Sequence, residues 1–261
     1  MTRTLTLAAA VLMILPPTLA SAQINFPKNA YYVAMGDSVA AGEGAMPVTH
    51  GYTYQLYEQA TFGLRQQVDF ANVAVRGARS WELRDHQVAQ VLCAEPAQRP
   101  TVVTITAGAN DFLRNDFNIS GIAARVVDAI NLLLNNDNGL VGAPVLDPIT
   151  LRPCRALANV TILVSNYYSI PHPVPLVFAQ LDAALSGFDQ ALRYWLQFTT
   201  VPQGSRVAIV DLYAASEGRQ GLVTIERRLG LQGPFDFDIH PTNLGHTFIA
   251  QEFEAVWNGL P

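Results

Sequence analysis

Residues 101–107 read TVVTITA, and residues 160–165 read VTILVS. Both runs are almost continuously apolar and rich in β-branched side chains, a composition typical of strands that are covered on both faces. Three further apolar runs complete the set, at residues 31–35, 68–75 and 206–212. The five runs therefore predict the strands of one buried sheet.

Helical patterns alternate with these runs, and this alternation predicts that the strands are parallel. The helical patterns lie at residues 52–66, 81–92, 119–135, 176–198 and 243–257. Such an alternation predicts an α/β fold, a three-layer α/β/α sandwich around a central parallel sheet of about five strands. Ligands of these sheets bind beyond the carboxyl ends of the strands. The residues that follow each strand are therefore the first candidates for a site.

The N-terminal segment has the pattern of a secretory signal peptide. It reads MTRTLTLAAAVLMILPPTLASAQ, with Arg3 before a short apolar stretch and Ala20-Ser21-Ala22 as a small-x-small cleavage signature. We expect residues 1–22 to be removed before Gln23, leaving residues 23–261 as one secreted domain. Later apolar stretches are too short to predict a transmembrane helix.

Composition argues against a nucleic-acid partner and predicts a disulfide. The formal net charge is −5 and the basic residues are not clustered, so nucleic acid is not an expected partner. The chain has two cysteines, Cys93 and Cys154. An even pair in an exported chain predicts a disulfide, whereas two distant cysteines without nearby histidines do not resemble a zinc site. No metal is expected.

The first strand runs into a glycine-rich turn, GDSVAAGEG at residues 36–44. A phosphate-binding loop would need a lysine or a third glycine here, yet the single lysine is Lys28 and the G-x-G at 42–44 continues as Ala-Met-Pro. The turn therefore does not fit a nucleotide cofactor. Ser38 instead stands just past a strand end, among small residues that leave its hydroxyl accessible.

Similar short motifs follow other predicted strands. Gly77 lies in NVAVRGA after the second strand, Gly108-Ala109-Asn110-Asp111 follows the third, and DIHPT at residues 238–242 precedes the last helix. In order and spacing, these blocks and the GDS of Gly36–Ser38 resemble the SGNH (GDSL-type) hydrolase family, which has a flavodoxin-like fold. The resemblance covers nearly all of residues 23–261.

The resemblance implies an acyl-transfer mechanism without a cofactor. Ser38 is the expected nucleophile and His240 the expected general base. The backbone N–H groups of Ser38 and Gly77 and the side-chain amide of Asn110 are the expected oxyanion donors. We interpret Asp37 as a hydrogen-bond acceptor that braces the turn.

The acid that orients His240 is ambiguous in the sequence. The family usually places it three residues before the histidine, where this chain has Phe237. In an extended segment Asp238 lies on the same side as His240, whereas in a helical turn Asp236 comes nearer. A backbone carbonyl is the third alternative. We expect Asp238.

The expected function is that of a secreted esterase or lipase acting on a small-molecule or lipid ester, as a monomer. A carbohydrate acetylesterase and a non-catalytic binding module on the same fold are the alternatives. The long loop at residues 136–153 is expected to border the site. Apolar residues at 140–146 and 176–178 suit acyl chains, but core packing explains them equally well.

Overall fold

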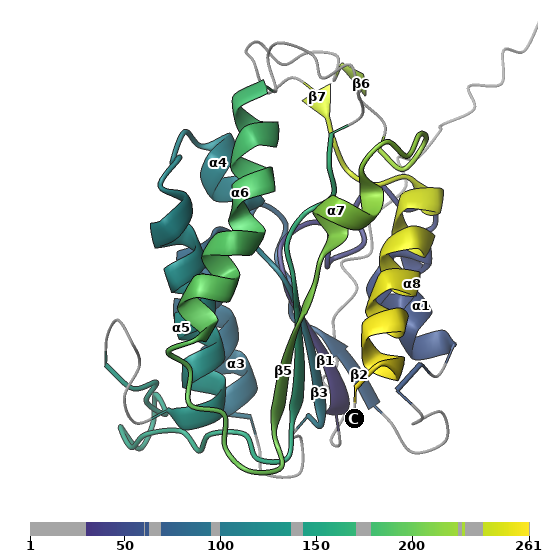
Figure 1. The fold of residues 1–261 in the computed structure, drawn as a ribbon. Helices are drawn as coiled ribbons and strands as arrows, with labels where there is room; N and C mark the ends of the chain where they lie inside the picture. Colours follow the sequence, from purple (N-terminus) through teal and green to yellow (C-terminus); the bar gives the residue numbers. More distant parts are fainter. Residues whose placement is uncertain are drawn as a thin grey trace, which may run out of the picture.

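Five parallel strands form the centre of the molecule (Figure 1). The computed structural model describes residues 30–59, 61–62, 69–94, 100–136, 143–170, 179–223, 226–227 and 237–260. The strands are β1 (Ala30–Gly36), β2 (Asp69–Asn72), β3 (Val102–Thr106), β4 (Thr161–Ser165) and β5 (Arg206–Val210). Their order across the sheet is β2-β1-β3-β4-β5, the flavodoxin-like order. The predicted fold class is confirmed.

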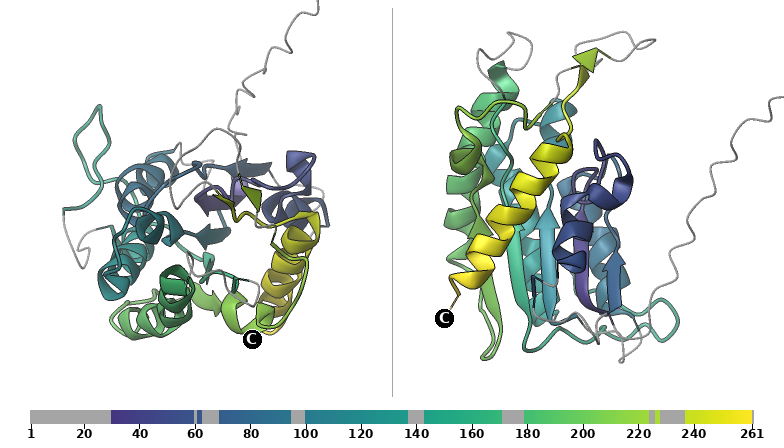
Figure 2. Two further views of the ribbon diagram at one scale, coloured as in Figure 1. Left: turned by 90° about the horizontal axis from the view of Figure 1, so that it is seen from above. Right: turned by 90° about the vertical axis from the view of Figure 1, so that its right-hand side faces the viewer.

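Two layers of helices cover the sheet, as expected from the buried strands. Helices α1 (Tyr52–Glu58) and α8 (Asn243–Asn258) lie on one face, and α3 (Val88–Leu92), α5 (Ile119–Asn135) and α6 (Ala179–Leu196) lie on the other (Figures 1 and 2). For α1, α3, α5 and α6 this division follows from right-handed crossovers, because the chain moves one way from β1 to β2 and the opposite way from β2 onward. Helix α8 follows the last strand of the sheet and packs beside α1.

The sheet is buried because its side chains are apolar on both faces. All five residues of β3 are buried, and so are four of the five in β4. Helix α5 contributes an apolar face that includes Ile122, Val126 and Ile130, each fully buried. Burial of such side chains contributes about 1.5–3 kcal/mol each, so this layer carries much of the stability.

Several short elements were not predicted. Helices α4 (Ala109–Leu113) and α7 (Leu212–Ser216) follow directly after β3 and β5. Five residues make less than two turns, too few for a periodic pattern. The chain also forms a short antiparallel pair, β6 (Glu226–Arg227) with β7 (Phe237–Asp238), and a 3₁₀ turn η1 (Val48–His50).

The predicted helix at 81–92 is composite. It consists of α2 (Ser80–Glu82), a π-helical turn η2 (Leu83–Gln87) and α3. Such π-turns are often found near functional sites because they redirect side chains. Here the turn ends at Gln87, whose buried side chain reaches the end of β1.

The predicted disulfide is present and joins Cys93, after α3, to Cys154. The described part of the long loop, residues 143–153, leads directly into Cys154, and its Leu146 carbonyl lies 3.8 Å from the Cys93 Sγ. It lies at the amino ends of the strands (Figure 1). None of these described residues lines the candidate site, so for residues 143–153 the expectation that the loop borders the site is wrong. The reason is geometric: α5 runs antiparallel to the strands and therefore delivers the loop to the opposite end of the sheet.

No described helix is both long enough and apolar enough to cross a membrane. The predicted signal peptide at 1–22 and the apolar residues 176–178 lie outside the described residues.

Candidate active site

A pocket with both polar and apolar lining opens at the carboxyl ends of β1 and β3, where the strand order changes direction. Ligand sites of doubly wound sheets form at this position because the loops of neighbouring strands diverge there. The pocket has a volume of about 330 Å³. Its lining comes from the turn after β1, the loop after β2, helix α4, the residues after β4 and the segment before α8.

The turn that carries Ser38 is pressed against β3. Gly36 has a φ of +133°, and a Cβ atom there would lie 2.0 Å from the carbonyl oxygen of Thr106. The side chain of Gln87 pairs with both backbone groups of Gly36, each at 2.7 Å. These contacts fix the exit of β1, so Ser38 projects into the pocket from a rigid turn.

Ser38, His240 and Asp238 form a hydrogen-bonded line. The Ser38 Oγ lies 2.7 Å from the His240 Nε2, and the His240 Nδ1 lies 2.6 Å from the Asp238 Oδ1. The backbone N–H of His240 also donates to Asp238 at 3.0 Å. A hydrogen bond from Nδ1–H to the carboxylate leaves Nε2 free to accept the serine proton. Among the three alternatives for the partner of His240, the structure places Asp238 in contact with the ring; Asp236 lies outside the described residues.

The His240 segment, residues 238–242, packs directly on the Ser38 turn, residues 37–44. Gly44 has a φ of +90°, and a Cβ atom there would lie 2.2 Å from the Pro241 carbonyl oxygen and 2.9 Å from the His240 Cβ. Only glycine permits this approach at this backbone angle. Gly44 therefore allows the two segments to bring their side chains together.

His246 ties the same turn to two helices. Its Nε2 lies 2.8 Å from the Glu43 carbonyl oxygen, and its Nδ1 accepts a hydrogen bond from the Tyr52 backbone N–H at 3.3 Å. Burial lowers the pKa of His246 to about 4, so the ring is neutral near pH 7. The ring is fully buried and its contacts are structural.

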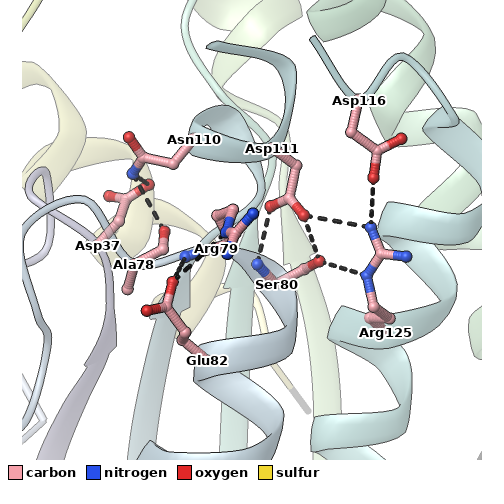
Figure 3. Close-up of polar contacts among 9 residues, drawn as sticks. All are labelled: Asp37, Ala78, Arg79, Ser80, Glu82, Asn110, Asp111, Asp116 and Arg125. Atoms are coloured by element: carbon pink, nitrogen blue, oxygen red, sulfur yellow. Dashed lines mark hydrogen bonds and ion pairs between the residues drawn. The ribbon is translucent and has the colours of Figure 1, made fainter. Parts of the chain in front are cut away.

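Gly77 and Asn110, the other candidate oxyanion donors, both line the pocket. Gly77 adopts a φ of +75°. The Asn110 Nδ2 donates to the Ala78 carbonyl at 3.1 Å and lies 3.4 Å from the Asp37 Oδ2 (Figure 3). The stronger contact with Ala78 orients the amide, while the longer one leaves a donor beside the pocket.

A partly buried ionic network centred on the buried Asp111 holds the loops that carry Gly77 and Asn110. The Asp111 carboxylate accepts hydrogen bonds from the Ser80 backbone N–H and hydroxyl, both at 2.8 Å, and from Arg125 at 3.2 Å (Figure 3). Arg125 also donates to Ser80 at 2.7 Å and to Asp116 at 2.9 Å. A buried carboxylate needs such partners because desolvation is costly. The network links the loop after β2 to helix α4.

Asp37 and the consecutive tyrosines Tyr167 and Tyr168 complete the lining of the pocket. The buried Asp37 carboxylate accepts hydrogen bonds from the Val39 backbone N–H at 3.0 Å and from the Tyr167 hydroxyl. Burial raises the pKa of Asp37 to about 6, and these hydrogen bonds partly oppose the rise. The Tyr168 hydroxyl donates to the Ile239 carbonyl at 2.9 Å. Sequence reasoning identified neither tyrosine.

Comparison with protein families matches the family described as GDSL-like Lipase/Acylhydrolase to residues 32–253. The chain belongs to this family. The matched range contains all the candidate site residues, and the family's chemistry is the hydrolysis of esters. A comparison with curated proteins finds no match.

Solved structures of esterases share the fold of this GDSL-like hydrolase. A lipase, Lip_vut3, from a goat rumen metagenome has a TM-score of 0.58 at 18% identity over 87% of this chain and 97% of that one. A carbohydrate esterase family 3 protein from Talaromyces cellulolyticus has a TM-score of 0.56 at 16% identity, covering 88% and 96%. A lipolytic G-D-S-L family protein from Veillonella parvula has a TM-score of 0.55 at 14% identity, covering 88% and 98%. At these identities the likeness concerns the fold alone.

Proposed function

We propose that this chain is a secreted serine esterase that cleaves carboxylic esters through an acyl-enzyme on Ser38. The observation that carries the proposal is the continuous hydrogen-bonded line from Ser38 through His240 to Asp238. A nucleophile, a base and an acceptor that orients the base are the elements that acyl transfer needs. The same line argues against a non-catalytic binding module, in which Ser38 and His240 need not meet.

In the first half-reaction the Ser38 Oγ attacks the ester carbonyl carbon while His240 Nε2 removes the hydroxyl proton. The C–O bond to the alcohol then breaks, and His240 delivers its proton to the departing alcohol oxygen. Asp238 accepts the hydrogen bond from Nδ1–H throughout and stabilises the imidazolium that forms. The product bound to the protein is an ester of Ser38.

In the second half-reaction, water hydrolyses the acyl-enzyme, and Ser38 is now the leaving group. His240 removes a proton from the water molecule, the resulting oxygen attacks the acyl carbonyl, and Ser38 leaves with the proton that His240 returns. The carboxylic acid is released and the free serine is restored. Each role falls to a residue of this chain, so we propose that the reaction uses neither a metal nor a cofactor.

Negative charge on the carbonyl oxygen is stabilised on the opposite side of the pocket from His240. We propose the Ser38 and Gly77 backbone N–H groups and the Asn110 Nδ2 as its donors. An oxyanion would replace the 3.4 Å contact between Asn110 and Asp37, while the Ala78 carbonyl keeps the amide oriented. Preorganised donors of this kind stabilise the transition state most because they need not reorient during the reaction.

The pocket favours small acyl or alcohol groups. Its volume of about 330 Å³ lies at the lower end of the range for ligand sites. The charged residues Glu43 and Arg76 stand at its rim and pair with each other. This small pocket with a polar rim makes a carbohydrate acetylesterase the second candidate, consistent with the similarity in fold to a carbohydrate esterase.

A panel of esters tests the proposed function. Purified protein is assayed on p-nitrophenyl esters of increasing acyl length and on acetylated xylan, with Ser38→Ala as the matched control and a chelator in a parallel series. We expect hydrolysis of short-chain esters that Ser38→Ala lacks and that the chelator leaves unchanged. Equal hydrolysis by the two proteins would rule out Ser38 as the nucleophile. Acetate release from the glycan at a higher kcat/KM than from the simple esters would favour the second candidate.

Secretion is proposed from the N-terminal pattern at residues 1–22 and is consistent with the disulfide. Expression of the full chain with N-terminal sequencing of the exported product tests it. We expect the mature protein to begin at Gln23.

A further inference from the structure

Two consecutive tyrosines connect the two halves of the candidate active site. Tyr167 and Tyr168 follow β4 in the sequence SNYYS, and both are buried, with exposures of 2% and 6%. The Tyr167 hydroxyl donates to the Asp37 Oδ2, in the residue before Ser38. The Tyr168 hydroxyl donates to the carbonyl of Ile239, in the residue before His240.

Their adjacency explains how one short segment reaches both halves. The two rings lie next to each other, with centroids 6.4 Å apart, yet their hydroxyl groups reach two different segments of the chain. Those segments are far apart in the chain, since Ser38 and His240 are separated by 202 residues. The two tyrosines leave the end of β4, the neighbour of β3 in the sheet, and therefore start from a rigid base.

We infer that Tyr167 and Tyr168 are positioning residues that hold the Ser38 turn and the His240 segment at reacting distance. The inference rests on the proposed function, because the distance that they set matters only if Ser38 reacts. Tyr167 acts through the Asp37 carboxylate and Tyr168 through the Ile239 carbonyl. The hydroxyl groups are the active parts, while the buried rings contribute packing that phenylalanine would keep.

Tyr167 has a second effect, on the charge of Asp37. The groups that act electrostatically on Asp37 or respond to it are Tyr52 on α1, Asp111 on α4, Tyr167 and Tyr168 after β4, and His240. The hydrogen bond from Tyr167 stabilises the carboxylate form and lowers its pKa. The carboxylate in turn faces the Asn110 amide and attracts the positive charge that His240 gains during the reaction. Loss of the Tyr167 hydroxyl therefore raises the pH at which Asp37 ionises.

Three conservative variants test the inference. Tyr167→Phe and Tyr168→Phe each remove one hydroxyl from the pair. Tyr32→Phe is the matched control, because Tyr32 is also a buried tyrosine with a single hydrogen bond, to Thr104 in the core. For each protein, kcat and KM are measured on the best ester of the panel across pH 5–9, together with the midpoint of thermal unfolding.

We expect both Tyr167→Phe and Tyr168→Phe to lower kcat about tenfold or more with KM within about twofold, because small displacements of reacting groups are costly. In Tyr167→Phe the acid limb of the kcat/KM profile moves to higher pH, whereas in Tyr168→Phe it stays in place. Tyr32→Phe should lower the unfolding temperature and leave kcat unchanged.

Other outcomes overturn the inference. If wild type is active and Ser38→Ala is not, but both tyrosine variants keep the wild-type kcat, the tyrosines do not position the site while the proposed function stands. A loss of kcat that Tyr32→Phe shows equally would reduce their role to general stability. A wild type no more active than Ser38→Ala would overturn the proposed function, and the positioning role with it.

Discussion

The two ends of the central sheet are held together by different means. At the carboxyl ends, buried polar side chains from distant parts of the chain hydrogen-bond to the loops, as Gln87 does at Gly36 and Tyr168 at Ile239. At the amino ends, a disulfide adds a covalent link to the hydrogen bonds of Asn136, and the nearby loop exposes Ile149 (88%) and Leu151 (71%) to solvent. One end sets the distances between polar groups; the other holds the chain covalently.

This difference separates catalysis from stability. Hydrogen bonds with fixed partners at the carboxyl ends determine where Ser38, Asn110 and His240 stand relative to one another. A disulfide constrains the unfolded chain and needs no particular geometry at a distant site. Changes at the carboxyl ends should therefore alter kcat, whereas matched changes at the amino ends should alter only the free energy of unfolding.

The largest expected effect is that of Asp238→Asn. An amide in place of the carboxylate favours the wrong tautomer of His240 and leaves the imidazolium without its counter-charge, so kcat should fall by about 10³–10⁴. Steady-state kinetics on the best ester measures it. The matched control is Asp147→Asn at the amino ends, where Asp147 accepts hydrogen bonds from Ile149 and Thr150. An unchanged kcat in Asp238→Asn would show that a carboxylate is not needed there.

The next effect is that of Asn110→Ala. Loss of one oxyanion donor should cost about 3–4 kcal/mol of transition-state stabilisation, or about 10²–10³ in kcat, with a smaller change in KM. Asn136→Ala offers the comparison, since the Asn136 side chain bonds the backbone of Val145 and Cys154 at the amino ends. We expect it to lower stability and leave kcat unchanged. If Asn136→Ala lowered kcat and Asn110→Ala lowered only the stability, the distinction between the two ends would not hold.

Removal of the disulfide tests the comparison with a change at the amino ends of the strands. Cys93 and Cys154 are 61 positions apart in the sequence, and replacing both with serine removes the constraint that their bond places on the unfolded chain. In the loop-entropy description this should cost about 4 kcal/mol of stability. Chemical denaturation measures the loss. Well below the unfolding transition, kcat should remain within about twofold of wild type; a tenfold loss would mean that the amino ends also shape the site.

The smallest predicted effect concerns pH. The pKa of His246 is about 4 in the folded protein against 6.5 in the unfolded chain, so the unfolded state alone takes up a proton as pH falls through this window. The stability that the neutral ring contributes is present above pH 6.5 and is lost toward pH 4, by about 3 kcal/mol. Asp37 acts in the opposite sense, because its raised pKa of about 6 makes stability fall as pH rises toward that value.

The variant His246→Gln separates the contribution of His246 to the pH dependence of stability from that of Asp37. The free energy of unfolding is measured for wild type and His246→Gln at pH 4 and pH 7, so that the Asp37 contribution cancels in the difference. We expect the substitution to cost about 3 kcal/mol more at pH 7 than at pH 4. A cost independent of pH would mean that His246 has an ordinary pKa in the folded protein.

Much of the fold could be predicted from the sequence because the pattern is local. The buried runs at 101–107 and 160–165 predicted β3 and β4, and alternation with helices predicted the parallel sheet. Parallel strands end at one edge, which is why Ser38 and Asn110 could be expected near each other. Alternation with His240 favoured Asp238 among three alternatives, and the structure has Asp238 in contact with the ring.

The remaining features depend on contacts that leave no local signal. Tyr167 meets a partner 130 residues away, and Gln87 meets one 51 residues away. The sequence around a tyrosine, here SNYYS, does not show which distant group its hydroxyl contacts. The long loop was misplaced because its length suggested function, while the direction of α5, which decides its position, was not used.

Direct observation of the acyl-enzyme tests the central claim. The protein is mixed with a short-chain p-nitrophenyl ester, quenched in acid within the first turnover, digested and analysed by mass spectrometry. We predict a burst of p-nitrophenol close to one equivalent and one added acyl group on the peptide that contains Ser38, with both signals absent from Ser38→Ala. An acyl group on another residue, or a burst that survives in Ser38→Ala, would contradict the proposed mechanism.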